Sequence, residues 1–467
     1  MPHVKRLEAR VLFTDSDMAW RLSVRLDKIE HMFERAPTTG ADLRWFVGAL
    51  GRLDDRVDDA ERVDQIRLLE EIKSAAAAAQ ATVTSDFVAS QRAAQVQAGV
   101  QAGEVGAGIA AQVALAKRES PARARRYVGW ARILTSELPN TFAALQQGRI
   151  TEWRAQIVAR ETAWLAAEHR AQVDAELASM LETFGDRTLE AETKKLAYRL
   201  DPHGYLGRIS KAESERRVSL RPAPDTMSVL RGFLPVAQGV SVLAALRQHA
   251  DSLRSRGDER SRGQIMSDTL VERVTGRASA DGAPVEVRLV MTDQALMNYG
   301  AASDEPAHLE GYGPVPAELA RRIAKTGGSK AGLWLRRLFT SPETGALVAM
   351  ESRRRHFDDG LADVLVVRDQ VCRTPWCGAP IRHKDHVIPV EERGVTSEAN
   401  GQGLCEACNY AKQATGWQAR ASGGGAGEEI EITTPTGHRY RSRPPPLPRG
   451  TPPSRVEIVF ADLIRAA

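Results

Sequence analysis

The sequence has few cysteines and no long apolar run. Four cysteines among 467 residues exclude a disulfide-rich secreted scaffold. No stretch reaches the ~18 uninterrupted apolar residues that a membrane span requires. The N-terminal residues also lack the basic, apolar and small-residue order of a secretory signal. We therefore expect a cytoplasmic protein that does not contact a membrane.

A surplus of charge of either sign is also missing. The chain has 64 Lys+Arg against 60 Asp+Glu, a formal net charge of +4, so bulk charge predicts no nucleic-acid partner. Arginine outnumbers lysine by 53 to 11, which favours forked contacts with phosphates, but a genome rich in G and C gives the same bias. The length predicts two or three domains. Nucleic-acid binding must therefore be argued from a site.

The four cysteines form one cluster in the sequence. Cys372 and Cys377 are followed, after a longer insert, by Cys405 and Cys408. Two closely spaced pairs are typical of a tetrahedral zinc site, whereas a disulfide pair or free thiols are the alternatives. The surrounding segment 351–420 has few aromatic residues and cannot bury much apolar surface. Structural zinc, which contributes on the order of 10–16 kcal/mol in zinc-finger peptides, would fold it.

Residues with catalytic chemistry lie between and beside the cysteines. Asp385 and His386 stand in a short β-type run, 381–388, and Asn400 follows in a polar loop. A helix is expected to start near Leu404. On it, positions i, i+3, i+4 and i+7 share one face, and they are occupied by Cys405, Cys408, Asn409 and Lys412. The second cysteine pair and Asn409 would thus be held by one rigid element.

This segment resembles the HNH endonuclease family, in which two short strands and a helix form a ββα-metal unit. The resemblance rests on the Asp385–His386 pair, on Asn400, and on C-x-x-C-N-x-x-K from 405 to 412. It implies His386 as general base, Asp385 and Asn409 as ligands of a catalytic Mg²⁺ or Mn²⁺, and Asn400 as the residue that orients the imidazole by a hydrogen bond. The cysteines Cys372, Cys377, Cys405 and Cys408 would hold structural zinc.

That chemistry suits phosphodiester hydrolysis, since a neutral histidine activates water and a hard cation neutralises phosphoryl oxygens. Adjacent strand residues point to opposite faces, so the strand should bend near 385–386 if both side chains address one phosphate. The chain departs from the usual pattern at Asn409, where many relatives have histidine, and at Arg393–Gly394, where two glycines are frequent.

Structural roles are the alternatives for these residues. His386 and His383 would then be ordinary structural histidines, Asn400 a turn cap and Asn409 a helix-surface residue. Lys412 would either contact a phosphate or lie in solvent. Segment 351–420 has ten Lys+Arg and ten Asp+Glu, so it is neutral. A neutral module that binds DNA either binds weakly or depends on a basic surface elsewhere.

The preceding residues predict successive helices up to about residue 200. Ser120–Pro121 starts one of them. Trp153, Ile157, Trp164 and Leu165 follow a helical period and are expected in the core. A β-hairpin is predicted near 216–235, a strand near 285–291 and a helix over 333–339. The stretches 114–151, 231–235 and 311–322 resemble the domain of unknown function 222, or 13E12 repeat, family, which implies a fold but no catalytic residue.

After residue 420 the sequence predicts a glycine-rich linker, a β-hairpin over 429–443, a proline-rich segment and a terminal helix over 455–467. His438, Arg439, Arg441 and Arg443 would form either a basic edge that faces DNA or a solvated hairpin. The predicted domains are thus a helical domain (1–345), an HNH module (346–420) and a tail (421–467).

The expected fold class is mainly α with small α+β parts: a large helical domain, a zinc-stapled ββα-metal module and a hairpin tail. The predicted function is that of a metal-dependent DNA endonuclease, with DNA as partner and with homo-oligomerisation through the helical domain left open. The alternatives are a non-catalytic, zinc-stapled nucleic-acid-binding or regulatory protein and a protein-interaction scaffold. Retention of Asp385 and His386 favours the enzyme, because binding alone needs only the cysteines.

Overall fold

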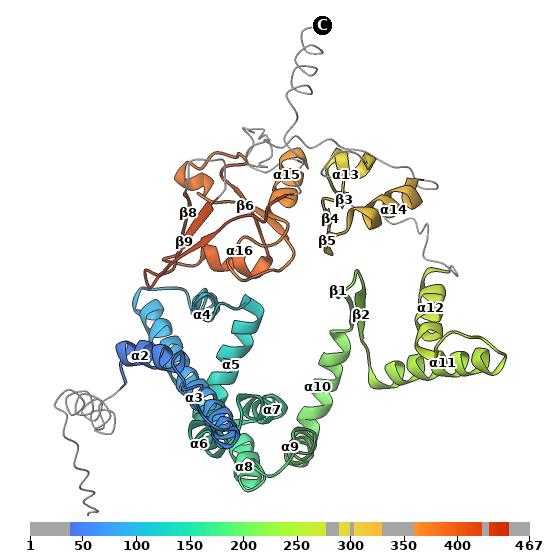
Figure 1. Cartoon of the computed structure of the whole chain (residues 1–467). Coiled ribbons are helices and arrows are strands. Elements are labelled where there is room, and N and C mark those ends of the chain that lie inside the picture. The colour runs from blue at the N-terminus through green and yellow to red at the C-terminus, as the bar shows by residue number, and fades with distance from the viewer. Residues whose placement is uncertain (1–37, 277–288, 299–302, 329–358, 423–428, 448–467) are drawn as a thin grey trace, which may run out of the picture. The chain divides into compact units, whose positions relative to one another are not determined.

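The computed structural model describes residues 38–276, 289–298, 303–328, 359–422 and 429–447 (Figure 1). Contacts divide the chain into two units between Leu69 and Glu70, inside the long helix α3 (Asp59–Gln97). In the first unit, helix α2 (Gly40–Leu50) begins with a capping box. Thr39 Oγ1 accepts the N–H of Asp42, and the Asp42 carboxylate accepts the N–H of Thr39.

A helical bundle forms the first part of the second unit. After α3 it contains α4 (Ile109–Lys117), α5 (Pro121–Glu137), α6 (Pro139–Gln146), α7 (Glu152–Thr162), α8 (Ala167–Leu177), α9 (Asp186–Leu200) and α10 (Pro202–Ser214). Its core consists of fully buried aliphatic side chains such as Leu134, Leu145 and Leu177. As predicted, Ser120 caps α5 ahead of Pro121, because its hydroxyl accepts the N–H of Arg123.

The expected core position of Trp153 was wrong. Ile157 and Leu165 are buried and Trp164 packs at the edge of the core, but Trp153 is 51% exposed and lies under the Arg160 guanidinium. Within α7 the buried face consists of Ala155, Ile157, Val158, Ala159 and Thr162, and Trp153, in the first turn of this helix, lies outside it. Trp164 and Leu165 follow the end of α7 at Thr162 and do not belong to that face.

Small sheets and helices follow the bundle. The predicted hairpin is present as antiparallel strands β1 (Arg217–Pro222) and β2 (Ser228–Phe233), followed by α11 (Val236–Ser255) and α12 (Arg262–Thr275). A second antiparallel sheet comprises β3 (Leu289–Val290), β4 (Ala307–Leu309) and β5 (Gly313–Val315), accompanied by α13 (Asp293–Met297) and α14 (Ala317–Gly328). The rest of the strand expected near 285–291, and the helix expected over 333–339, lie outside the described residues.

The cysteine segment forms a compact ββα unit that follows helix α15 (Asp359–Asp369) in the sequence. Strand β6 (His383–His386) pairs antiparallel with β7 (Gly401–Leu404), the 3-10 turn η1 (Val390–Glu392) follows β6, and helix α16 (Glu406–Gln413) follows β7. Cys405 stands directly before α16, close to the predicted helix start. The order of strand, loop, strand and helix agrees with the fold expected from the cysteine and Asp-His pattern.

A three-stranded antiparallel sheet comes last, in the order β10–β9–β8. It contains β8 (Gln418–Ser422), β9 (Glu429–Thr433) and β10 (Arg439–Ser442), so the predicted hairpin over 429–443 is confirmed and gains a third strand. Ile430 and Ile432 of this sheet pack with Val387, just after β6. Of the two predicted domain limits, 345 falls among residues outside the description and 420 falls inside β8, so the division stays a prediction. The predicted helix over 455–467 lies outside the described residues.

The architecture is thus mainly α with small α+β parts, as the sequence predicts. Among the described helices, none combines the length and the apolar character that crossing a bilayer requires.

Candidate active site

The four cysteines come together as a metal-binding cluster. All are buried, and all their Sγ atoms lie within 4.8 Å of one another. The Sγ atom of Cys377 is 3.6 Å from that of Cys405 and 3.7 Å from that of Cys408. A tetrahedral zinc with Zn–S bonds of about 2.3 Å separates its sulfur ligands by about 3.8 Å. The donor set and its spacing therefore fit zinc, and the distances exclude disulfides between these pairs.

Backbone geometry explains why this spacing works. The Cys372 N–H donates to Ala379 O, which closes the first knuckle around Cys377. The second pair sits at the N-terminus of α16, where Cys405 precedes the helix and Cys408 follows one turn later. Hydrogen bonds among the four thiols lower the pKa of Cys372, to about 7, and that of Cys405, whereas they raise the pKa of Cys377 and that of Cys408. Two of the thiols thus deprotonate more readily than a free cysteine and two less readily.

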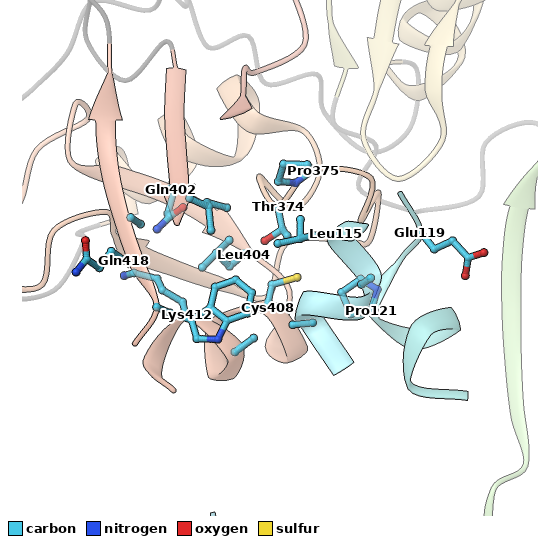
Figure 2. Close-up of a pocket in the computed structure, with 16 residues that line it drawn as sticks. Leu115, Glu119, Pro121, Thr374, Pro375, Gln402, Leu404, Cys408, Lys412 and Gln418 are labelled. Carbon is cyan, nitrogen blue, oxygen red and sulfur yellow. The ribbon is translucent and has the colours of Figure 1, made fainter. Parts of the chain in front are cut away.

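Asp385 and Lys412 form an ion pair between the strand and the helix. Lys412 Nζ lies 2.5 Å from Asp385 Oδ2, and it also donates to the main-chain oxygen of His386. Both side chains are mostly buried. Lys412 is therefore not a solvated residue of the helix surface. It links α16 to β6 through the Asp385 carboxylate and the main chain of His386. Figure 2 shows Lys412 and Cys408 on this helix, beside Gln402 and Leu404 of β7.

Asn409 lies on the same helix, one turn before Lys412. It is buried, and among the described residues its Oδ1 atom has no hydrogen-bond partner. A buried amide oxygen without a partner is unfavourable unless something else satisfies it. An amide oxygen is an acceptable ligand of a hard cation such as Mg²⁺ or Mn²⁺. The unsatisfied oxygen of Asn409 therefore fits the metal-ligand role that the resemblance implies for it, whereas the Asp385 carboxylate is held by Lys412.

His386 has a partner that the sequence did not indicate. Its Nε2 atom lies 2.8 Å from the hydroxyl of Thr396, a buried residue of the loop between β6 and β7. Pairing of β6 with β7 stays regular through His386, so the expected bend is not present within the strand. Asp385 and His386 instead contact different elements, the first α16 and the second the loop.

The role expected for Asn400 needs correction. Its Nδ2 group donates to Ile388 O and Val395 O, and its Oδ1 accepts the N–H of Ile388. Both amide hydrogens are thus given to main-chain oxygens rather than to the His386 imidazole. Asn400 closes the loop that carries Thr396, because it joins the start of the loop to its end. It therefore acts on His386 only indirectly, through the loop.

The loop geometry also explains the departure at Arg393–Gly394. Arg393 adopts a left-handed conformation with φ of 65°, which is unusual for a residue other than glycine. A Cβ atom at position 394 would meet Ile388 O at 1.8 Å, so only glycine fits there. One glycine of the usual pair is therefore required by close approach, and arginine takes the left-handed position of the other.

A buried charge network anchors the unit to α15. The Asp369 carboxylate accepts hydrogen bonds from Arg368, Arg373 and the N–H of Gly403, at distances of 2.6–3.1 Å. Arg368 also donates to the main-chain oxygens of Glu398 and Gly401, 2.7 Å away in each case. The network therefore fixes β7 and the end of the loop. Asp369 and Arg373 are only four residues apart in the sequence. The contacts with the loop and with β7 join residues 30–34 positions apart, and no sequence pattern predicts them.

Glu398 is the least satisfied member of this region. Its carboxylate is fully buried, lies 3.8 Å from Arg368 and has no hydrogen-bond partner among the described residues. Burial raises the pKa of this carboxyl.

His383, on the same strand face as Asp385, stacks at an angle against Tyr410 of α16, in keeping with the structural role expected of it.

Comparisons with known proteins agree with this arrangement. Residues 66–369 match the family described as domain of unknown function, DUF222, and residues 371–415 match the HNH endonuclease family. No curated protein and no solved structure matches the chain. Because the first match covers more than half of the chain, the chain belongs to the DUF222 family, and its cysteine-bearing ββα unit is of the HNH endonuclease type.

Proposed function

We propose that this protein is a metal-dependent DNA endonuclease that hydrolyses phosphodiester bonds at Asp385 and His386. The observation that carries the proposal is the buried Oδ1 atom of Asn409, which has no partner among the described residues although it lies one turn from the lysine that binds Asp385. A zinc knuckle that served only to bind nucleic acid would have no need of a buried, unsatisfied oxygen.

Asp385 and Asn409 would hold the catalytic Mg²⁺ or Mn²⁺, which supplies positive charge for the phosphoryl oxygens and the leaving alkoxide. His386 takes the proton of the attacking water. The Thr396 hydroxyl, 2.8 Å from Nε2, orients the imidazole by a hydrogen bond, and Asn400 holds Thr396 in place by closing the loop.

The test is nicking of supercoiled plasmid by purified protein with Mg²⁺, with Mn²⁺, or without a divalent metal. The wild type should nick in a metal-dependent manner, and His386→Ala should be at least about 100-fold slower, because a general base contributes at least that factor. Zinc content and circular dichroism should be equal in both proteins. His383→Ala serves as the matched control on the same strand and should retain activity.

Three results would count against this function. Equal nicking by wild type and His386→Ala would indicate a contaminant or a different site. Binding of DNA without nicking under any metal would favour the non-catalytic, zinc-stapled binding protein. A wild type that neither binds nor nicks DNA would favour an interaction scaffold.

Thr396 permits a finer test of the same site. Thr396→Val removes the hydroxyl at 2.8 Å from His386 while it keeps the side-chain volume, and kcat should fall on the order of ten-fold, the worth of about one hydrogen bond, with KM unchanged. Thr396→Ser should restore most of the rate. A Thr396→Val enzyme with wild-type kcat would show that the hydroxyl does not orient the imidazole.

A further inference from the structure

The β1–β2 hairpin has two chemically different faces. Residues that pair across the strands share a face, and the register pairs Leu220 with Leu230 and Ser219 with Arg231. Alternation therefore puts Val218, Leu220 and Leu230 on one face. The opposite face carries Arg217, Ser219 and Arg221 from β1, and Arg231 from β2 together with the apolar side chains of Val229 and Phe233.

The arginine face is exposed and positively charged. Arg217, Arg221 and Arg231 are all exposed. Within the described part of the chain, none of the three forms an ion pair with a carboxylate. Arg217 lies over the Phe233 ring at 4.9 Å and donates to the main-chain oxygen of Glu215. From 216 to 233 the sequence has four arginines and a single acidic residue, Asp225. Asp225 is in the turn, outside the strands.

The C-terminal sheet has as many exposed arginines but a different charge. Arg439, Arg441 and Arg443 were expected either to face DNA or to lie in solvent. In the structure Arg439 and Arg441 lie near Glu431, at 3.7 and 3.2 Å, and Arg443 lies 2.7 Å from Glu429. These carboxylates neutralise much of that edge. The two arginine clusters can thus be compared directly: the arginines of the C-terminal sheet form ion pairs with glutamates, whereas among the described residues those of the hairpin form none.

We propose that the arginine face of the β1–β2 hairpin, formed by Arg217, Arg221 and Arg231, binds the phosphates of duplex DNA. The proposal rests on the proposed function, because it supplies the substrate-binding surface of that nuclease. Segment 351–420 carries ten positive and ten negative residues, so the HNH unit has little electrostatic attraction for DNA of its own. Three unopposed guanidinium groups complement a polyanion, and guanidinium forks match phosphate geometry.

The dimensions of the hairpin suit this partner. Arg217 and Arg221 are four residues apart on one strand, which corresponds to about 13 Å at a rise of about 3.3 Å per residue. Arg231 lies across from Ser219, between them. A two-stranded ribbon fits the major groove of DNA, which is about 12 Å wide. In that position the arginine side chains contact phosphates of the DNA backbone. Such contacts bind the duplex without recognising its base sequence.

The decisive experiment measures how DNA binding depends on salt. Full-length, zinc-loaded protein is titrated into a fluorescently labelled duplex over a series of KCl concentrations, without divalent metal, so that no cleavage occurs. The test variant carries Arg217→Gln, Arg221→Gln and Arg231→Gln. Each lost phosphate contact lowers the slope of log K against log[salt] by about 0.9, so the slope should fall by about 2 to 3 and affinity at ~0.1 M salt on the order of 100-fold.

Two further triple variants control for bulk charge and for folding. Arg439→Gln, Arg441→Gln and Arg443→Gln removes the same charge from the paired cluster, and its slope should change by less than about 1. Arg217→Lys, Arg221→Lys and Arg231→Lys keeps the charge on the hairpin and should retain most of the wild-type slope. Loss of binding in the lysine variant with unchanged circular dichroism would point to guanidinium geometry and would still support the hairpin as the contact.

A wild-type slope in the glutamine variant of the hairpin, or an equal loss in the control at the C-terminal sheet, would overturn the proposal. The outcome is separate from that of the nuclease test. Hairpin-dependent binding by a protein that never nicks would support this surface and refute the enzyme. Metal-dependent nicking with unchanged binding in the hairpin variant would do the reverse.

Discussion

Replacing Cys408 with serine is expected to unfold the HNH unit and leave the helical bundle intact. The unit is small, and its buried apolar cluster consists of the four cysteines and Leu404, with Ala379 and Ala407 at its edge. Without metal, four thiols take the place of a hydrophobic core. Structural zinc contributes on the order of 10–16 kcal/mol in zinc-finger peptides, which exceeds the stability of a typical domain. The neighbouring buried cluster of Val387, Ile430 and Ile432 is small by comparison.

Hydrogen exchange of the full chain measures this effect by region. In Cys408→Ser, amides of β6, β7 and α16 should lose protection, whereas those of α5 and α7 should keep it, and bound zinc should fall from one per chain to near zero. Gln413→Ala, an exposed change at the end of the same helix, is the control and should behave as wild type. One zinc per chain and unchanged protection in Cys408→Ser would refute the four-cysteine site.

The second large effect is expected at Asp369. Asp369→Ala leaves Arg368 and Arg373 buried without their shared carboxylate and removes the acceptor of the Gly403 N–H. Breaking a buried ion pair by removing one partner destabilises a protein by about 3–5 kcal/mol. The loss should appear as weaker hydrogen-exchange protection of β6 and β7 by a factor on the order of 100 or more, since each ~1.4 kcal/mol is ten-fold.

The control for Asp369 is Glu392→Ala, which removes an exposed carboxylate from the same unit and should change protection little. Asp369→Asn keeps the shape and some hydrogen bonds, so it should fall between the two. If Asp369→Ala were as stable as Glu392→Ala, the network would contribute no more than surface charge does.

The parts of this molecule that depend on short-range patterns could be predicted from sequence. The cysteine pairs, the Ser120 cap and both hairpins are specified by residues within a few positions of one another. The unpredicted contacts join distant positions. Thr396 meets His386, and Lys412 meets Asp385, only because the β6–β7 loop and α16 pack against one strand. Nothing in the spacing of these residues indicates a bond.

The two wrong details have different origins. Asn400 was expected to bond the His386 imidazole because the family pattern names the residue without its partner, and the main chain of the loop takes its amide instead. Trp153 was assigned to the core because it falls on a helical period with Ile157, but the buried face of α7 runs through Ala155, Val158 and Ala159 and leaves Trp153 outside it. Periodicity groups residues on one side of a helix without giving the width of the buried face.

The position of Asp369 also affects where the chain can be divided into a DUF222 part and an HNH part. The match to the DUF222 family ends at this residue, and the HNH match begins at 371. Asp369 nevertheless supplies the carboxylate for Arg373 and Gly403, on the HNH side of that limit. A gene fusion or a protein fragment that starts at 371 would therefore carry the buried Arg373 without the Asp369 carboxylate that it binds. Recombination that joins the HNH unit to a different N-terminal domain should keep the end of α15 with the HNH unit. The structural limit of the unit therefore lies before residue 371, where the HNH family match begins.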